Sequence, residues 1–216
     1  MTTYHLQSKS TLLFCITVMI LVMISVGCSP FGGGPAPDPS STETSPTKKL
    51  TVVVHIEDGT ETSTSDPQIK AMVRPEPLVN HVTLNQKITI QILIDDVVNL
   101  TGGEMDICFN PTVLQVIDAD HEKTGIQVQH GNYLVPDIVV SNEVDNTNGK
   151  ITYAIVQFPP NPPLNGTGTF LTVTFKGIAD GESEVSFEII KLADDRGAFI
   201  AHTVQNGVIT VGDNTQ

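Results

Sequence analysis

The chain has 216 residues, a formal net charge of −13 at pH 7 and no tryptophan. This acidity argues against nucleic acid as a partner, because phosphate binding requires clustered Lys and Arg. The length suffices for one domain with a substantial core once the terminal segments are set aside.

An apolar segment near the amino terminus, residues 11–26, follows Lys9. An apolar stretch of this length behind a weakly positive start is typical of a secretory signal peptide, and it is short for a membrane span. We therefore predict a signal peptide over residues 1–27.

Residues 25–29 read Ser-Val-Gly-Cys-Ser, which resembles a bacterial lipobox, although Ser25 stands where Leu is usual. The resemblance implies that Cys28 receives a diacylglyceryl group and becomes the amino terminus of the mature protein. Acyl chains contribute about 0.8 kcal/mol per buried CH₂, so two or three chains hold a protein durably on a bilayer. Cleavage by the ordinary signal peptidase and an uncleaved single-span anchor are the alternatives. The expected location is the cell envelope or the cell surface, with the membrane contacted through the lipid anchor.

Residues 28–49 are rich in Pro, Gly, Ser and Thr. Such a segment cannot bury enough apolar surface to offset its ordering entropy, which predicts a disordered linker. The next residues, 50–56, read Leu-Thr-Val-Val-Val-His-Ile and are strand-like. They either add an edge strand or extend the linker. The folded domain is expected over residues 50–216.

Apolar and polar residues alternate in several short runs, at residues 88–94, 105–109, 171–175 and 185–189. A period of two places alternate side chains on opposite faces of a strand. Turn-forming pairs separate the runs: Asp58-Gly59, Gly102-Gly103, Asn148-Gly149, Asn165-Gly166, Asp180-Gly181 and Asn206-Gly207. No long stretch has helical spacing. The pattern predicts an all-β domain, an antiparallel β-sandwich of about nine strands, with a closed barrel as the alternative.

Four motifs follow one another along this domain in a fixed order. They read IDDVVNLTGGEMDICFNPTVLQVID at 94–118, GKITYA at 149–154, GTGTFLTVTF at 166–175 and LADDRG at 192–197. Their succession resembles a cohesin domain, the receptor module of cellulosomes and related surface assemblies. The turn before Glu104 is nearer to the second class of cohesins, which serves surface attachment, than to the first class.

The resemblance implies a jelly-roll sandwich that binds a dockerin, a small calcium-loaded pair of helices, on one flat sheet face. That partner-binding face is expected to include Gly102, Glu104 and Asp106 from one strand and Tyr153 and Ile155 from a neighbour. Tyr153 is the candidate hot spot, because it is amphipathic and loses little conformational entropy on immobilisation. The alternative is that Tyr153 and Ile155 point inward as core residues. First-class cohesins carry Asn and Asp where Gly102 and Glu104 stand, so their polar contacts are not transferred to this chain.

No catalytic motif is recognisable, and the histidines are scattered singly. The acidic pairs at 95–96 and 194–195 lack the spacing of a calcium loop, so we expect no cofactor and no structural calcium in this chain, with calcium on the dockerin partner. We predict a non-catalytic cell-surface module that docks dockerin-bearing proteins, in polysaccharide degradation or a related surface complex. The alternative is a carbohydrate-binding or adhesion sandwich without dockerin binding. Polysaccharide is the less favoured partner, because cellulose platforms usually stack sugar rings on exposed aromatic side chains.

Overall fold

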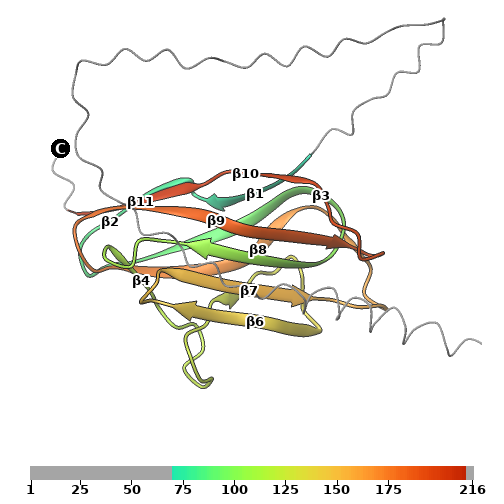
Figure 1. Ribbon diagram of the computed structural model, residues 1–216, viewed down its shortest axis with the longest axis horizontal. Helices are drawn as coiled ribbons and strands as arrows, with labels where there is room; N and C mark the ends of the chain where they lie inside the picture. Colours follow the sequence, from blue (N-terminus) through green and yellow to red (C-terminus); the bar gives the residue numbers. More distant parts are fainter. Residues whose placement is uncertain (1–69, 213–216) are drawn as a thin grey trace, which may run out of the picture. The chain divides into compact units, whose positions relative to one another are not determined.

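The computed structural model describes residues 70–212, and every regular element in this range is a β-strand (Figure 1). The strands are β1 (Ala71–Glu76), β2 (Val79–Val82), β3 (Lys87–Cys108), β4 (Leu114–Val116), β5 (Gln129–His130), β6 (Ile138–Asp145), β7 (Lys150–Val156), β8 (Leu164–Gly177), β9 (Gly181–Asp194), β10 (His202–Val204) and β11 (Gly207–Val211). Residues 70–212 contain no helix that could cross a membrane. The predicted signal peptide, Cys28, the linker and the strand-like residues 50–56 lie outside the described residues.

Strand β3 is long and takes part in two layers. Its first half, residues 87–95, pairs antiparallel with β1 and β8, and its second half, residues 100–108, pairs antiparallel with β7 and β9. Between the halves the register shifts, and Asp96 and Asn99 adopt positive φ angles of 49° and 59°. Asp and Asn tolerate positive φ better than other non-glycine residues. They therefore suit the place where the strand passes from one layer to the other.

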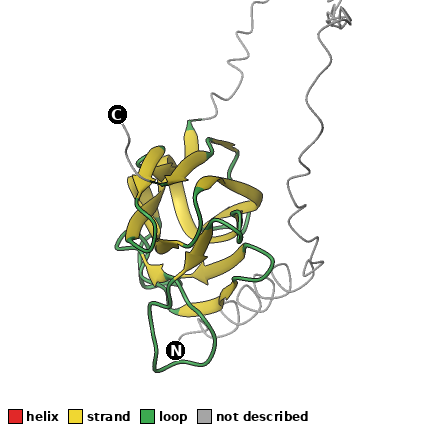
Figure 2. Ribbon diagram, turned by 90° about the vertical axis from the view of Figure 1, so that its left-hand side faces the viewer, coloured by secondary structure: helices red, strands yellow, loops and turns green. Residues whose placement is uncertain are grey.

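The two layers are parts of one curled sheet. One layer has the order β10-β1-β3-β8, with β4 and β5 paired to the other edge of β8, and the second layer has the order β9-β3-β7-β6. The start of β9 pairs with β11, which pairs in parallel with β2. Apart from this pair and the parallel pair β1–β10, the pairings are antiparallel. Figure 2, seen along the strands, shows the layers wrapped around a common interior. The predicted all-β sandwich is confirmed.

The core lies where the alternating runs place their apolar side chains. Ile90, Ile92 and Ile94 in β3 are at most 1% exposed, and in β8 the side chains of Val173 and Phe175 are equally buried. Each lies two residues from the next apolar residue of its strand, as the period of a strand requires. The alternation in the sequence therefore identified the core-facing side of both strands.

Two of the predicted turns are wrong. Gly102-Gly103 lies inside β3, and Asn165-Gly166 lies inside β8. A Cβ atom on Gly103 would lie 2.8 Å from Cζ of Phe170, so this glycine permits close packing across the sandwich. Gly166 has a φ of 101° and lies opposite the bend of β3, where the register between the two strands shifts.

The structure has more strands than the nine expected, because three strands are too short to show alternation. β4, β5 and β10 contain three, two and three residues. A second difference lowers the number of strands. The runs at 88–94 and 105–109 were predicted as separate strands, and both belong to the continuous 22-residue strand β3.

Candidate functional site

The layer β9-β3-β7-β6 turns one side toward the core and the other away from it. In β3, Met105 and Ile107 are completely buried in the core, so the alternating residues Glu104 and Asp106 lie on the opposite side. The strand registers place residues of β7 and β9 beside them. We call this side the outer face, and it includes Gly102, Glu104, Asp106, Lys150, Thr152, Ala154, Glu188 and Lys191.

Lys150 connects three strands across the outer face. Its Nζ atom, at the start of β7, lies 2.9 Å from Oδ2 of Asp106 in β3 and 3.7 Å from Oε2 of Glu188 in β9. Thr152 donates a hydrogen bond from Oγ1 to Oδ1 of Asp106 at 2.9 Å. Both carboxylate oxygens of Asp106 are therefore engaged, which compensates for the low exposure of its side chain.

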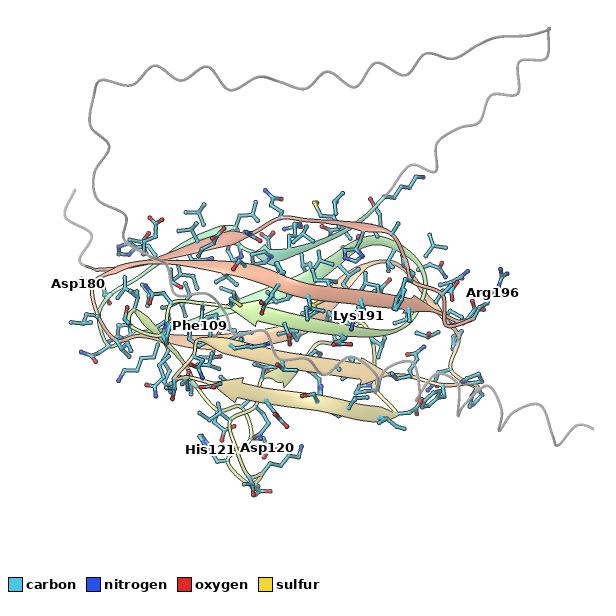
Figure 3. The ribbon with its side chains drawn as sticks, in the orientation of Figure 1. Phe109, Asp120, His121, Asp180, Lys191 and Arg196 are labelled. Atoms are coloured by element: carbon cyan, nitrogen blue, oxygen red, sulfur yellow. The ribbon has the colours of Figure 1, made fainter. Side chains whose placement is uncertain are left out.

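A second ion pair lies beside the first. Nζ of Lys191 in β9 is 3.2 Å from Oε2 and 3.4 Å from Oε1 of Glu104 in β3. Figure 3 labels Lys191, which lies three residues before the end of β9. The exposed fractions of the two side chains are 26% for Lys191 and 14% for Glu104, so the pair is partly accessible to solvent. The outer face thus holds charged groups on paired strands, where a binding partner would meet them without having to order a loop.

Three of the predicted site residues, Gly102, Glu104 and Asp106, lie on the outer face. Two of them, Gly102 and Asp106, are less accessible than residues on a freely exposed surface. Asp106 is only 6% exposed and is held by Lys150 and Thr152. A Cβ atom on Gly102 would lie 3.0 Å from the carbonyl oxygen of Ile155, so this glycine allows β3 and β7 to approach closely.

The other two predicted residues, Tyr153 and Ile155, do not lie on the outer face. Both have 0% exposure and belong to the core, and the ring of Tyr153 packs edge-on against Phe170 at 5.5 Å between centroids. Burial is the cause of a raised pKa at the Tyr153 phenol. The expectation that these two side chains point outward is therefore wrong, and the alternative of ordinary core positions holds.

The residues that share the outer face with Glu104 were missed at the sequence level. In β7 the apolar set, Ile151 with the buried Tyr153 and Ile155, alternates with Lys150, Thr152 and Ala154. Alternation applied strictly to residues 150–156 would have placed the lysine and the threonine outward. Lys191 has no such signal, because its neighbours in β9 do not form a clean alternating run.

A buried hydrogen bond joins the core to strand β5. The hydroxyl of Tyr153 lies 2.6 Å from Nδ1 of His130. The pKa of His130 is lowered, mainly because burial disfavours the charged imidazole and secondarily because of Lys123. The hydrogen bond between the Tyr153 hydroxyl and Nδ1 of His130 links β5 to the core.

Residues 116–128 are fastened to the last half of strand β6 by two asparagines. Asn142 accepts from the backbone nitrogen of Val128 and donates to its carbonyl, both at 2.8 Å. Asn146, just beyond β6, makes the same pair of bonds to the backbone of Val116, at 2.8 and 3.0 Å. Each asparagine side chain thus makes the two hydrogen bonds to one residue's backbone that a neighbouring strand would otherwise make. This fastening covers only part of the edge of β6.

One carboxylate in each of the two acidic pairs noted in the sequence has structural partners. Asp95 accepts from Nε of Arg74 at 2.6 Å, and Asp194 accepts from the backbone nitrogens of Arg196 and Ala198 at 2.9 and 2.8 Å. Across residues 70–212, no three His, Cys, Asp or Glu side chains come together in a way that could hold a metal ion. The carboxylate of Asp95 therefore belongs to an ion pair, and that of Asp194 stabilises a turn.

No family model and no curated protein matches the chain. Solved structures do match, and cohesins are among them. A type II cohesin domain from the cellulosome of Acetivibrio cellulolyticus is 21% identical, with a TM-score of 0.56 over 65% of this chain and 95% of that one. A non-cellulosomal cohesin from the archaeon Archaeoglobus fulgidus is 14% identical, with a TM-score of 0.53 over 68% and 94%.

Similar structures also include a cohesin with a bound partner. The sixth cohesin of scaffoldin B from Acetivibrio cellulolyticus, solved in complex with a mutant Cel5 dockerin, is 12% identical, with a TM-score of 0.51 over 66% of this chain and 99% of that one. A type I cohesin from Pseudobacteroides cellulosolvens matches as well, at 16% identity and a TM-score of 0.54, over 68% and 96%. The described residues therefore have the fold of cohesin domains of both types.

Proposed function

We propose that this chain is a non-catalytic protein-binding module that docks a dockerin-bearing protein on its outer face. The observation that carries the proposal is the cohesin fold, shared with a cohesin solved in complex with a dockerin. The outer face adds a physical reason. It is built on paired strands, and its ion pairs fix the positions of Lys150 and Lys191, so binding orders few side chains.

Sugar binding is the alternative, and the aromatic residues argue against it. A carbohydrate platform needs exposed aromatic rings. Of the two tyrosines in the described part of the chain, Tyr153 is completely buried and Tyr133 is partly buried. Phe199, at 66% exposure, is a single strongly exposed ring, and it lies opposite Ala193 near the end of β9. One ring offers no extended platform for a polysaccharide chain.

The proposal includes export and a lipid anchor at Cys28, both inferred from residues 1–29. Cohesin similarity is consistent with a protein that works outside the cell, in polysaccharide degradation or a related surface complex. Calcium would belong to the dockerin. Replacement of Cys28 with Ala should move the protein from the membrane fraction to the soluble fraction, and unchanged fractionation would refute the anchor.

Calorimetry of the full-length chain in mild detergent against a panel of calcium-loaded dockerins tests the docking proposal. We expect binding to at least one dockerin, and loss of binding when a chelator removes calcium. If every dockerin fails at high micromolar concentration while insoluble polysaccharide retains the chain, the partner class is wrong.

A matched pair of lysine variants tests the outer face itself. Lys191→Ala removes the cation beside Glu104, and the control Lys176→Ala removes a partly buried lysine from β8 in the other layer. We expect Lys191→Ala to weaken dockerin binding by about tenfold, in the range of a charged contact in an interface. Equal losses of dockerin affinity in both variants would contradict the proposal that the dockerin binds on the outer face. Thermal unfolding of both variants separates binding from stability.

A further inference from the structure

The first half of strand β6 is an uncovered, apolar sheet edge. Among the described strands, β6 pairs only with β7, and residues 116–128 are fastened to its last half. Ile138, Val139 and Val140 are 41%, 45% and 41% exposed. Exposed edges are usually protected by charges, proline or bulges. Here the register of β6 shifts between Val139 and Ser141, and the three consecutive apolar residues nevertheless remain exposed.

The other half of the same edge is acidic. Glu143 and Asp145 of β6 are exposed, and the fastened residues 116–128 add Asp118, Asp120 and Glu122 against one lysine, Lys123, which pairs with Asp120 at 2.9 Å. Figure 3 shows Asp120 and His121 on a loop that extends beyond β6, away from β7. We call this surface the β6 margin, and its members are Asp118, Asp120, Glu122, Ile138, Val139, Val140, Glu143 and Asp145.

Three of the margin's carboxyl groups, those of Asp118, Asp120 and Asp145, have lowered pKa values. The pKa of Asp120 is lowered, first by its hydrogen bond with Lys123 and then by the backbone nitrogen of Glu122. The pKa of Asp145 is lowered by bonds from the side chain and backbone of Asn148 and from the backbone of Thr147. Of the margin's acids only Asp120 has a lysine partner among the described residues, so the margin presents net negative charge beside an apolar strip.

We propose that the β6 margin binds a basic amphipathic segment of the docked protein. Apolar side chains of that segment cover Ile138 to Val140, and its Lys or Arg side chains face the carboxylates farther along. The inference rests on the proposed function and names the chemistry of the partner, because β6 borders β7 and the margin continues the outer face. An anionic lipid surface would be repelled by the same carboxylates.

The charge half is tested with two designed probes. One is a helical peptide with Leu on one side and Lys on the other, and the second carries Glu in place of Lys. Fluorescence anisotropy with the full-length chain in neutral detergent gives Kd at low and high salt. We expect the Lys peptide to bind, its affinity to fall with salt, and the Glu peptide not to bind. Equal binding of the two peptides would overturn the proposal.

Charge reversal locates the binding. Glu122→Lys with Glu143→Lys changes the margin, and Asp180→Lys with Glu182→Lys makes the same change of net charge at the start of β9. The margin variant should bind the Lys peptide about tenfold more weakly than the unchanged chain, and this binding should depend less on salt. The control variant should retain most of the affinity. Equal losses in both variants would show that only the net charge of the chain matters, which overturns the proposed site.

The apolar half needs its own variant. Ile138→Thr with Val140→Thr keeps both side chains β-branched, so strand propensity is retained while apolar surface is lost. We expect weaker binding at high salt, where the charge contribution is screened. Dockerin titrations separate the two proposals. If a dockerin binds the Glu122→Lys, Glu143→Lys variant with unchanged affinity, the proposed role of the β6 margin is refuted and the docking function is retained. Failure of every dockerin refutes the docking function.

Discussion

Replacement of Tyr153 with Phe tests whether this residue belongs to the core or to the binding surface. The change removes one hydroxyl and leaves the ring, which keeps its edge-on contact with Phe170. It also removes the 2.6 Å hydrogen bond to Nδ1 of His130. Because the core position places the hydroxyl away from the outer face, we expect a loss of stability and no loss of partner affinity.

The magnitude follows from the buried partner that is left behind. Loss of a buried hydrogen bond that leaves one group unsatisfied costs about 1–3 kcal/mol. His130 is only partly buried and can recover a bond to water, so we expect the lower part of this range. Tyr153→Ala removes the ring as well, and large-to-small changes of core aromatics cost about 3–5 kcal/mol.

Urea unfolding of the full-length chain, followed by circular dichroism, measures both variants, and dockerin titration is done with Tyr153→Phe. The expected result is a lower unfolding midpoint with an unchanged Kd. A tenfold loss of affinity at unchanged stability would refute the core assignment and restore Tyr153 as a contact residue.

Three further predictions concern the elements around this core. The contribution of neutral His130 to the free energy of unfolding should be fully present above pH 6.5, the ordinary pKa of histidine. It should be lost as pH drops from there toward the lowered pKa of His130 in the folded protein, because the unfolded chain binds the proton first. A His130→Gln variant should lack this part of the pH dependence in thermal unfolding. Asn142→Ala removes both 2.8 Å bonds to Val128 and should make residues 116–128 more sensitive to limited proteolysis, whereas unchanged cleavage would show that the asparagine does not hold them. Gly103→Ala places a Cβ atom 2.8 Å from a ring atom of Phe170 and 3.2 Å from Leu192, so chemical denaturation should show a loss of about 1–3 kcal/mol, and a stable variant would mean that the ring can move aside.

The sequence supports the fold well because burial of one strand face imposes a period of two. Residues 88–94 of β3 show that period at every position except Leu93, and the inward side chains of Ile90, Ile92 and Ile94 belong to the core. The same rule misses features that depend on pairing. Gly102-Gly103 has the composition of a turn, yet β3 continues through it because β7 and β9 pair with both sides. Composition cannot distinguish a glycine that makes a turn from a glycine that admits a neighbour.

The candidate site was half predictable for a related reason. Glu104 and Asp106 are polar residues in a clean alternating run, so their side of β3 is set by the pattern. Tyr153 misleads because it is amphipathic, and its hydroxyl reaches a partly buried partner, His130, that lies 23 residues away in sequence. The ion pair between Lys191 and Glu104 spans 87 residues and depends on the register of β9 with β3.

Nuclear magnetic resonance mapping of the bound state tests the docking claim most directly. On titration with a calcium-loaded dockerin, the side-chain signals of Lys191 and the methyl groups of Thr152 and Ala154 should shift together. The threonine pair Thr89 and Thr174, bonded at 2.9 Å on the other layer, should not shift. Shifts confined to that other layer, or none at saturating dockerin, would contradict the account.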